Sequence, residues 1–142
     1  MVRAITLLLL ISPLSFAGDN STTIITKGTN NQITTKQVGN GNITYILCGA
    51  NSGGTITGAS YSAHSCTNAV WSSTVEGNSN TVKMYTVWSN NIGNSSTVNI
   101  DGNDNYAYID QDEDDNTVTI TQTGNDNHAE ALGSGDDNVY ST

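Results

Sequence analysis

Three aspartates at alternate positions resemble a metal-binding pattern more than any other residues of this chain do. Asp110, Asp112 and Asp114 are followed by a fourth, Asp115, and calcium prefers such carboxylate oxygens. A calcium loop of this kind needs glycine at its sixth place and glutamate at its twelfth, where this chain has Asp115 and Thr121. A solvated acidic turn is therefore favoured. Asp110, Asp112 and Asp114 remain weak calcium candidates, and calcium could act as a loose screen of acidic repulsion.

No other group of side chains is arranged for catalysis or for cofactor binding. His64 lies among glycines and serines, and His128 lies at an outward-facing position of the repeat described below. The sequence has no phosphate-binding glycine loop, no Cys/His metal cluster and no spacing that would assemble a serine, a histidine and an acid. We therefore expect no enzyme activity, no cofactor and no catalytic residue.

A short unit that begins with asparagine recurs through most of the chain, with a period of about 11 residues. Small, apolar or amide residues follow each asparagine at even offsets, while polar or charged residues such as Thr23, Lys36 and Asp110 occupy the odd offsets. A fixed period with an alternation of two inside it is typical of stacked β-arcs. The asparagines that begin the units are Asn20, Asn31, Asn42, Asn80, Asn94, Asn105, Asn116, Asn127 and Asn138.

The repeat predicts an all-β fold, a β-solenoid of stacked two-strand coils in which two units make a coil of about 22 residues. The even-offset residues would fill a narrow interior, and successive coils would stack roughly 4.8 Å apart. Stacking places asparagine over asparagine, so that the side-chain amides satisfy one another in a ladder. Gln37, Gln111 and Gln122, which end inward rows, are expected to join this stacking ladder.

Turns of the form Gly-x-x-Asn separate the strands, because glycine permits a positive φ without steric cost. Glu113 stands where other units have this glycine, so its turn is expected to differ. Three residues are inserted after Asn91, before Asn94 restarts the phase. The expected turn glycines are Gly28, Gly39, Gly77, Gly102, Gly124 and Gly135.

The chain begins like a secreted protein. Arg3 supplies a positive charge, residues 5–10 are apolar, and residues 15–17 form a small-x-small cleavage site. We expect residues 1–17 to be a secretory signal peptide and residues 18–142 to form one solenoid domain. No later apolar run is long enough to span a bilayer, so no membrane insertion is expected.

Two cysteines, Cys48 and Cys66, bound a stretch that loses the repeat phase and is rich in Gly, Ser and Ala. In a secreted protein an even pair favours a disulfide, which would pin the ends of an irregular excursion at 48–66. The Cα spacing that a disulfide needs, about 5.5 Å, is close to the rise between coils.

Acidic residues dominate the charge of the chain. Thirteen acids face four basic residues, the formal net charge is −9, and eleven of the acids lie from Asp101 onward. Nucleic acid and anionic membranes are therefore poor partners, since phosphate contacts need clustered Lys and Arg. The difference between a near-neutral N-terminal part and an acidic C-terminal part favours head-to-tail contacts between copies.

Four threonines alternate on one outward face of residues 117–123, which resembles the threonine arrays of ice-binding solenoids. Such an array needs threonine on neighbouring coils. In the preceding unit, residues 106–112, the matching positions carry tyrosine and aspartate. The sequence therefore favours β-branched residues that stiffen an exposed strand.

Several units also carry a family likeness. Gln37-x-Gly39-x-x-Asn42-x-Thr44, Gln122-x-Gly124-x-x-Asn127-x-Ala129 and the run from Tyr106 to Gln111 resemble the curlin repeat, Gln-x-Gly-x-x-Asn-x-Ala followed by another Gln. Curlins are the subunits of curli, extracellular functional-amyloid fibres that attach bacteria to surfaces and to one another. The resemblance implies a secreted structural subunit of an adhesive, biofilm-forming fibre. It also implies two further partners, an outer-membrane export channel and a nucleating subunit.

Self-assembly is the partner interaction that the repeat itself favours. A solenoid leaves an unpaired strand edge at each end, and such edges template another chain unless they are capped. We therefore expect a head-to-tail polymer at the cell surface. The alternative is a monomeric secreted β-solenoid that binds a ligand, a surface or ice, because a curlin-like repeat does not by itself require polymerisation.

Overall fold

The computed structural model describes residues 18–26, 28–48, 65–86 and 90–142. The expected signal peptide and residues 49–64 of the expected excursion lie outside the described residues. Among the described residues there is no helix with the length and hydropathy needed to cross a membrane.

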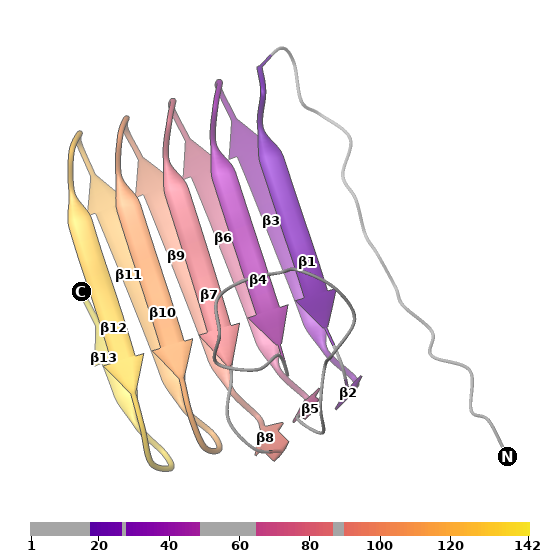
Figure 1. Ribbon diagram of the computed structural model, residues 1–142. Helices are drawn as coiled ribbons and strands as arrows, with labels where there is room; N and C mark the ends of the chain where they lie inside the picture. The colour runs from indigo at the N-terminus through magenta and orange to yellow at the C-terminus, as the bar shows by residue number, and fades with distance from the viewer. Residues whose placement is uncertain (1–17, 27, 49–64, 87–89) are drawn as a thin grey trace, which may run out of the picture.

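Two parallel five-stranded sheets lie face to face and form the body of the molecule (Figure 1). The front sheet of Figure 1 contains β1 (Ser21–Thr26), β4 (Ile43–Cys48), β7 (Thr81–Thr86), β10 (Tyr106–Gln111) and β12 (His128–Gly133). The back sheet contains β3 (Gln32–Val38), β6 (Val70–Glu76), β9 (Ser95–Asp101), β11 (Thr117–Thr123) and β13 (Val139–Ser141). A small third sheet contains β2 (Gly28–Thr29), β5 (Ser65–Thr67) and β8 (Asn90–Ile92).

The chain alternates between the front and back sheets, so that one strand of each makes a coil. Four coils and a shorter fifth follow one another along the stack, because β13 has only three residues. All strand pairs are parallel, as a solenoid requires when each coil repeats the path of the one before. The predicted all-β solenoid of two-strand coils is confirmed.

The register gives the length of each coil. Ser21 pairs with Ile43 and Tyr106 pairs with His128, so the residue number rises by 22 in both cases, which is the predicted coil length. Ile43 pairs with Thr81, a step of 38, because the segment between the cysteines lengthens the second coil. Thr81 pairs with Tyr106, a step of 25, so the third coil carries three extra residues.

These three residues lie earlier in the chain than the sequence predicted. Thr86 pairs with Cys48, and Asn91 pairs with Cys66 in the small sheet. The extra residues therefore lie between Thr86 and Asn91, and the predicted insertion after Asn91 is wrong. Asn91 follows Asn80 by one repeat period, which gave it an apparent place in the repeat, but it belongs to β8.

Alternation along each strand separates the interior from the surface. In β10 the side chains of Ala107 and Ile109 are fully buried, whereas Tyr106 and Tyr108 are half-buried on the outer face. The interior is a thin stack of such inward residues, which includes Ile46, Trp71, Val82, Met84, Val98, Ile109, Val118 and Ile120. Because this core is thin, the polar groups at the turns must also be satisfied within the stack.

Candidate functional site

Stacked asparagines hold successive coils together where the back sheet turns into the front sheet. In this first inner ladder, each asparagine donates from its backbone N–H to the Oδ1 of the asparagine one coil earlier: Asn42 to Asn20, Asn80 to Asn42, Asn105 to Asn80 and Asn127 to Asn105, each at 2.9 Å. The Nδ2 groups of the last three donate to the same oxygens at 2.9–3.1 Å.

The same amides also tie the ladder to the turn glycines. The Nδ2 of Asn80 donates at 2.8 Å to the carbonyl of Gly102, one coil further on, in addition to Asn42 Oδ1. Asn42 makes the equivalent bond to Gly77. Each fully buried asparagine therefore needs an oxygen that accepts and a nitrogen that donates, which no other side chain of this shape provides.

A second inner ladder runs along the opposite turns and has one interruption. Asn116 donates from its N–H to Asn94 Oδ1 at 2.8 Å, and Asn138 donates from Nδ2 to Asn116 Oδ1 at 3.0 Å. In the second coil Ala69 takes the place of asparagine and donates only its backbone N–H, to Asn31 Oδ1 at 3.1 Å. The repeat pattern could not place Ala69, because no asparagine marks the start of that unit.

The three glutamines do not stack on one another. Gln37, Gln111 and Gln122 each donate from Nε2 across the interior to a backbone carbonyl of the opposite sheet, 16 residues earlier, at 2.9–3.2 Å. Gln122, for example, bonds the carbonyl of Tyr106 within one coil. The glutamines therefore join the front and back sheets, whereas the asparagines join one coil to the next.

An outer ladder of asparagines, which the sequence analysis did not identify, runs along the surface of the Gly-Asn turns. Asn78 donates from its N–H and Nδ2 to Asn103 Oδ1, both at 2.9 Å, and Asn103 donates similarly to Asn125 at 2.9 and 3.0 Å. Asn40 donates from its N–H to Asn78 Oδ1 at 3.0 Å. These bonds point toward later coils, opposite to the inner ladder. The sequence signal was the motif Gly-Asn-x-Asn in four turns.

Glycine at the Gly-Asn turns is required by both conformation and space. Gly39, Gly77 and Gly102 have φ values of +97°, +106° and +145°. A Cβ atom on any of the three would lie 1.8–1.9 Å from the carbonyl oxygen of the glycine one coil further on. At Gly124 the nearest atom to such a Cβ would be Asn127 Nδ2, at 3.7 Å.

In the turns that lead from the front sheet to the back sheet, the glycine position is also occupied by glutamate. Glu113 adopts a φ of 74°, close to the 91° of Gly135 one coil later, so the expectation of a different turn at Glu113 is wrong. Its carbonyl accepts from Asn94 Nδ2 at 2.8 Å. Gly28, expected to be a turn glycine, lies instead in β2 and pairs with Cys66.

The predicted disulfide between Cys48 and Cys66 is present, with a Cα–Cα distance of 5.7 Å. Cys48 pairs with Thr26, and Cys66 pairs with Gly28, so the two cysteines take positions only two residues apart in the coil. The bridge therefore closes the base of the segment within one coil, rather than spanning the rise between two coils.

Loss of this disulfide should lower the free energy of unfolding by about 3 kcal/mol. The bridge joins cysteines 18 residues apart in the sequence, and closing this loop lowers the conformational entropy of the unfolded chain. Urea unfolding of oxidised and reduced protein measures the difference. The control is a Cys48→Ala/Cys66→Ala variant, whose stability should not respond to reductant. Equal urea midpoints for the oxidised and reduced wild type would contradict this expectation.

The weak calcium candidates do not come together. Asp110 lies on the outer face of the front sheet and accepts from the Tyr108 hydroxyl at 3.0 Å, while Asp114 Oδ1 accepts from the N–H of Ile92 at 2.7 Å. Asp112 lies between them, after the end of β10. Within the described ranges, no three His, Cys, Asp or Glu side chains are grouped so that they could hold a metal ion.

Burial sets the ionisation of the cluster around Asp110. Burial raises the pKa of the Asp110 carboxyl, and the hydrogen bond from Tyr108 lowers it in part. Burial, followed by the charge of the neighbouring Asp110, raises the pKa of the Tyr108 phenol. Burial also raises the pKa of Tyr85. The rings of Tyr85 and Tyr108 meet edge-on, with 5.4 Å between their centroids. The phenols therefore stay neutral. Because the folded state holds the Asp110 proton more tightly than the unfolded state does, the free energy of unfolding should fall as pH rises through the raised pKa of Asp110.

His128, the one histidine in the described residues, contacts one aromatic ring and one carboxylate at the surface. Its ring stacks on Tyr106 with 4.8 Å between ring centroids, and its Nε2 lies 2.9 Å from Glu130 Oε1 at the exposed surface. These contacts join β10 to β12 on the outer face of the front sheet.

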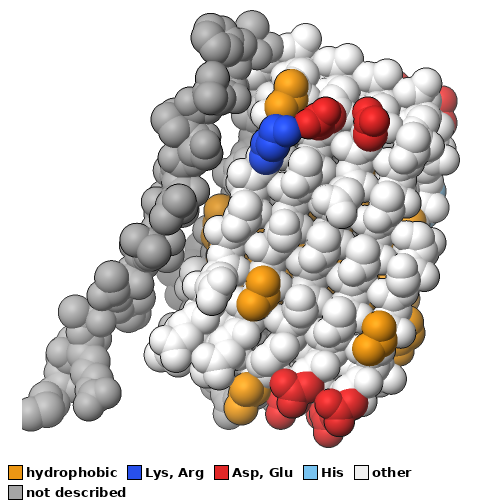
Figure 2. All heavy atoms as spheres, turned by 180° about the vertical axis from the view of Figure 1, so that it is seen from behind, with side chains coloured by type: hydrophobic (Ala, Val, Ile, Leu, Met, Phe, Trp, Pro, Cys, Tyr) orange, Lys and Arg blue, Asp and Glu red, His pale blue; other side chains and the backbone are white. Residues whose placement is uncertain are grey.

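The outer face of the back sheet is a flat array of short polar side chains (Figure 2). The neighbours of the threonines in β11 are residues of β9, one full coil earlier: Thr117 pairs with Ser95, and Thr119 pairs with Thr97. The expectation that tyrosine and aspartate flank these threonines is therefore wrong. One column carries a hydroxyl in every coil: Thr34, Ser72, Thr97, Thr119 and Ser141.

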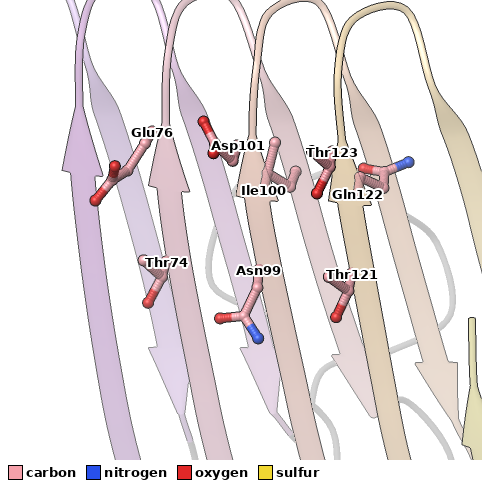
Figure 3. A pocket seen from close by; sticks show the side chains of 8 residues that line it. All are labelled: Thr74, Glu76, Asn99, Ile100, Asp101, Thr121, Gln122 and Thr123. Atoms are coloured by element: carbon pink, nitrogen blue, oxygen red, sulfur yellow. The ribbon is translucent and has the colours of Figure 1, made fainter.

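A shallow depression of about 170 Å³ lies on this face beside the Gly-Asn turns. Figure 3 shows its two rows across β6, β9 and β11: Thr74, Asn99 and Thr121 in one, and Glu76, Asp101 and Thr123 in the other. Lys36 binds Glu76 at 2.6 Å on the same face.

One comparison with known proteins identifies a repeat. Residues 114–139, which include β11 and β12, match the family model of the curlin-associated repeat. The predicted resemblance to curlins is confirmed for this segment, whose ladder residues are Asn116, Asn127 and Asn138. No curated protein and no solved structure matches the chain.

Proposed function

On the premise that the chain carries a curlin-type repeat, we propose that it is a structural subunit of an extracellular, curli-like fibre. Copies stack head to tail, and the fibres mediate adhesion and matrix formation. The observation that supports this proposal best is the polarity of the inner ladders. Every earlier asparagine accepts a bond from the following coil, whereas Asn127 and Asn138 have no donor to Oδ1 among the described residues.

In the first coil the side-chain amide of Asn20 is the matching donor for Asn127, while the backbone N–H of Asn20 donates to Gly18 O at 2.7 Å. Asn20 uses Nδ2 for one bond, to Gly39 O at 2.8 Å, whereas Asn80 in the middle of the stack donates from Nδ2 both to Gly102 O and to Asn42 Oδ1. A second copy placed one coil beyond the first would set its Asn20 over Asn127. The amide of Asn20 would then complete the rung that Asn127 leaves open.

Strand edges and charge at the two ends are also compatible. β12 and β13 form one edge of the two sheets, and β1 and β3 form the other, so both ends present parallel edges that pair with another strand. The last coil carries Asp136 and Asp137 in its turn, where the first coil has the neutral Thr29 and Asn30. Continued stacking therefore avoids acid over acid at this turn, whereas at the Gly-Asn turn Asp19 of the next copy would stand over Asp126.

Electron microscopy of residues 18–142, diluted from denaturant into buffer of moderate salt, tests the proposal. We expect filaments, and we expect their growth to quicken as ionic strength rises, because salt screens the repulsion between acidic copies. Compact monomers under all salt conditions would contradict the proposal and would favour a monomeric binding module instead.

A variant of the open edge makes this test specific. Successive residues of a parallel strand direct their N–H groups to alternate neighbours, and Tyr106 donates to the next coil, to Asn127 O at 2.8 Å. Glu130 pairs with Tyr108 and so directs its N–H to the outer edge of β12. Glu130→Pro removes this donor and should therefore stop filament growth. The monomer should still fold, since proline is tolerated on an edge strand.

Glu130→Ala is the matched control, because it removes the side chain and keeps the N–H. Both variants should give the circular dichroism of the wild-type monomer, and Glu130→Ala should still form filaments. Filaments of Glu130→Pro that grow at the wild-type rate would contradict elongation through this edge.

A further inference from the structure

We propose that filaments of this protein associate laterally through the outer face of the back sheet, with a second copy of the chain as the occupant. The inference rests on the proposed filament and adds the surface by which filaments bundle. The surface, named the hydroxyl face here, consists of the outward residues of β3, β6, β9, β11 and β13.

The first support is charge. The chain has a formal net charge of −9, so two copies repel wherever their acids meet. On the hydroxyl face the charged side chains in the described residues are Lys36, Glu76 and Asp101, and Lys36 neutralises Glu76 at 2.6 Å. All three lie toward the edge beside the Gly-Asn turns, and the other outward residues of these strands are uncharged. The acidic side chains at the lower border of Figure 2 lie outside these strands.

The second support is shape. The hydroxyl face carries Ser, Thr and Asn side chains of similar length in straight columns, such as Thr74, Asn99 and Thr121. Short side chains in register allow two sheets to interdigitate face to face, about 10 Å apart. The outer face of the front sheet cannot pack in this way, because it carries the large rings of Tyr85, Tyr106 and Tyr108.

The third support is unsatisfied apolar surface. Val38, Val70 and Val139 are 44%, 41% and 78% exposed, and all three lie on the hydroxyl face. Val70 and Val139 belong to one column, with Ser95 and Thr117 between them. Packing a second sheet on this column would remove Val70 and Val139 from water.

The area of the face explains why bundling should follow filament growth. Strands of seven residues in five layers give a face of roughly 23 Å by 24 Å, which is roughly 550 Å² per copy and roughly 1,100 Å² for a pair. A stable pair of proteins usually buries about 1,200–2,000 Å². Single copies should therefore not pair laterally, whereas each copy added to two filaments lengthens their common interface.

Two matched variants of the third coil test the inference. Thr97→Glu places a carboxylate at the centre of the hydroxyl face, and Thr81→Glu places the same group on the outer face of the front sheet. Both threonines are half-buried and lie outside the interior, so both variants should fold. Bundles are collected by low-speed centrifugation, single filaments by ultracentrifugation of the supernatant, and both fractions are examined by electron microscopy.

We expect the wild type and Thr81→Glu to sediment as bundles. For Thr97→Glu the amount of protein in the low-speed pellet should fall about tenfold, while normal filaments remain in the supernatant. The reason is that like charges would face one another across the interface. Equal bundling of Thr97→Glu and the wild type would overturn the inference, as would equal dispersal by both substitutions. Wild-type filaments that remain single would also overturn it and would assign another occupant to this face. Absence of filaments altogether would overturn the proposed function, and the inference with it.

Discussion

Replacement of Gly77 by alanine is expected to lower the free energy of unfolding by about 3 kcal/mol or more. Two costs combine at this residue. Its φ of +106° is unfavourable for any residue with a Cβ, and the new Cβ would lie 1.9 Å from Gly102 O and 2.7 Å from Gly102 C. Both contacts are with backbone, so relief requires the two coils to separate and the bonds that join Asn80 to Gly102 and to Asn105 to lengthen.

Gly124→Ala is the control for the contribution of space. Gly124 has a similar φ of +100°, but its nearest contact would be 3.7 Å away. This variant should carry only the conformational cost, about 1–2 kcal/mol. Urea unfolding followed by circular dichroism measures both variants. Equal losses for Gly77→Ala and Gly124→Ala would show that close stacking of the turns contributes nothing to stability.

Substitution of Asn80 by aspartate is expected to cost about 3 kcal/mol at neutral pH, although the two side chains have nearly the same shape. Asn80 is fully buried, and its Nδ2 donates to Asn42 Oδ1 and Gly102 O at 3.1 and 2.8 Å. A carboxylate oxygen in place of Nδ2 would face two acceptors and could donate to neither. Burial should also raise the pKa of the new carboxyl, so the loss should grow as pH rises through that value and shrink in acid.

Asn103→Asp is the matched control in the outer ladder. Asn103 donates from Nδ2 to Asn125 Oδ1 at 3.0 Å, so it loses the same kind of bond, but this bond is exposed to water. Its variant should cost less than about 1 kcal/mol. A loss at Asn103 as large as that at Asn80 would contradict the assignment of stability to the buried ladder.

The sequence predicted the fold where asparagine and alternation agreed. Asn105 and Asn127 mark the start of their strands, and the inward positions of β10 and β11 follow at even offsets, so the length of a coil could be derived from the residue pattern. The physical reason is that a strand exposes alternate residues and a stacked coil repeats its buried amides.

The same reasoning failed where the asparagine was absent or misleading. Ala69 gave no marker for its unit, so the buried Trp71 beside it was not recognised as a core residue. Asn91 gave a false marker, because spacing alone cannot separate an asparagine of the ladder from one in the small sheet. Glu113 adopts a glycine-like φ, which residue type alone would not predict.

The sequence also could not show which residues lie side by side in adjacent coils. Consecutive units of the repeat lie on opposite sheets, and every second unit is the one that touches, so the neighbours of Thr119 are Thr97 and Ser141 rather than Tyr108. The roles of the glutamines depended on the same distinction, because Gln122 reaches across its own coil to Tyr106. Both points require the coil to be closed in three dimensions.

The axial rise per subunit in the filament, measured by cryo-electron microscopy of residues 18–142, tests head-to-tail stacking most directly. Five layers at about 4.8 Å predict a rise of about 24 Å per subunit, with Asn20 of one copy above Asn127 of the copy before it. A rise of about 4.8 Å per subunit would mean that each chain contributes a single layer, which would contradict a solenoid that polymerises through its ends.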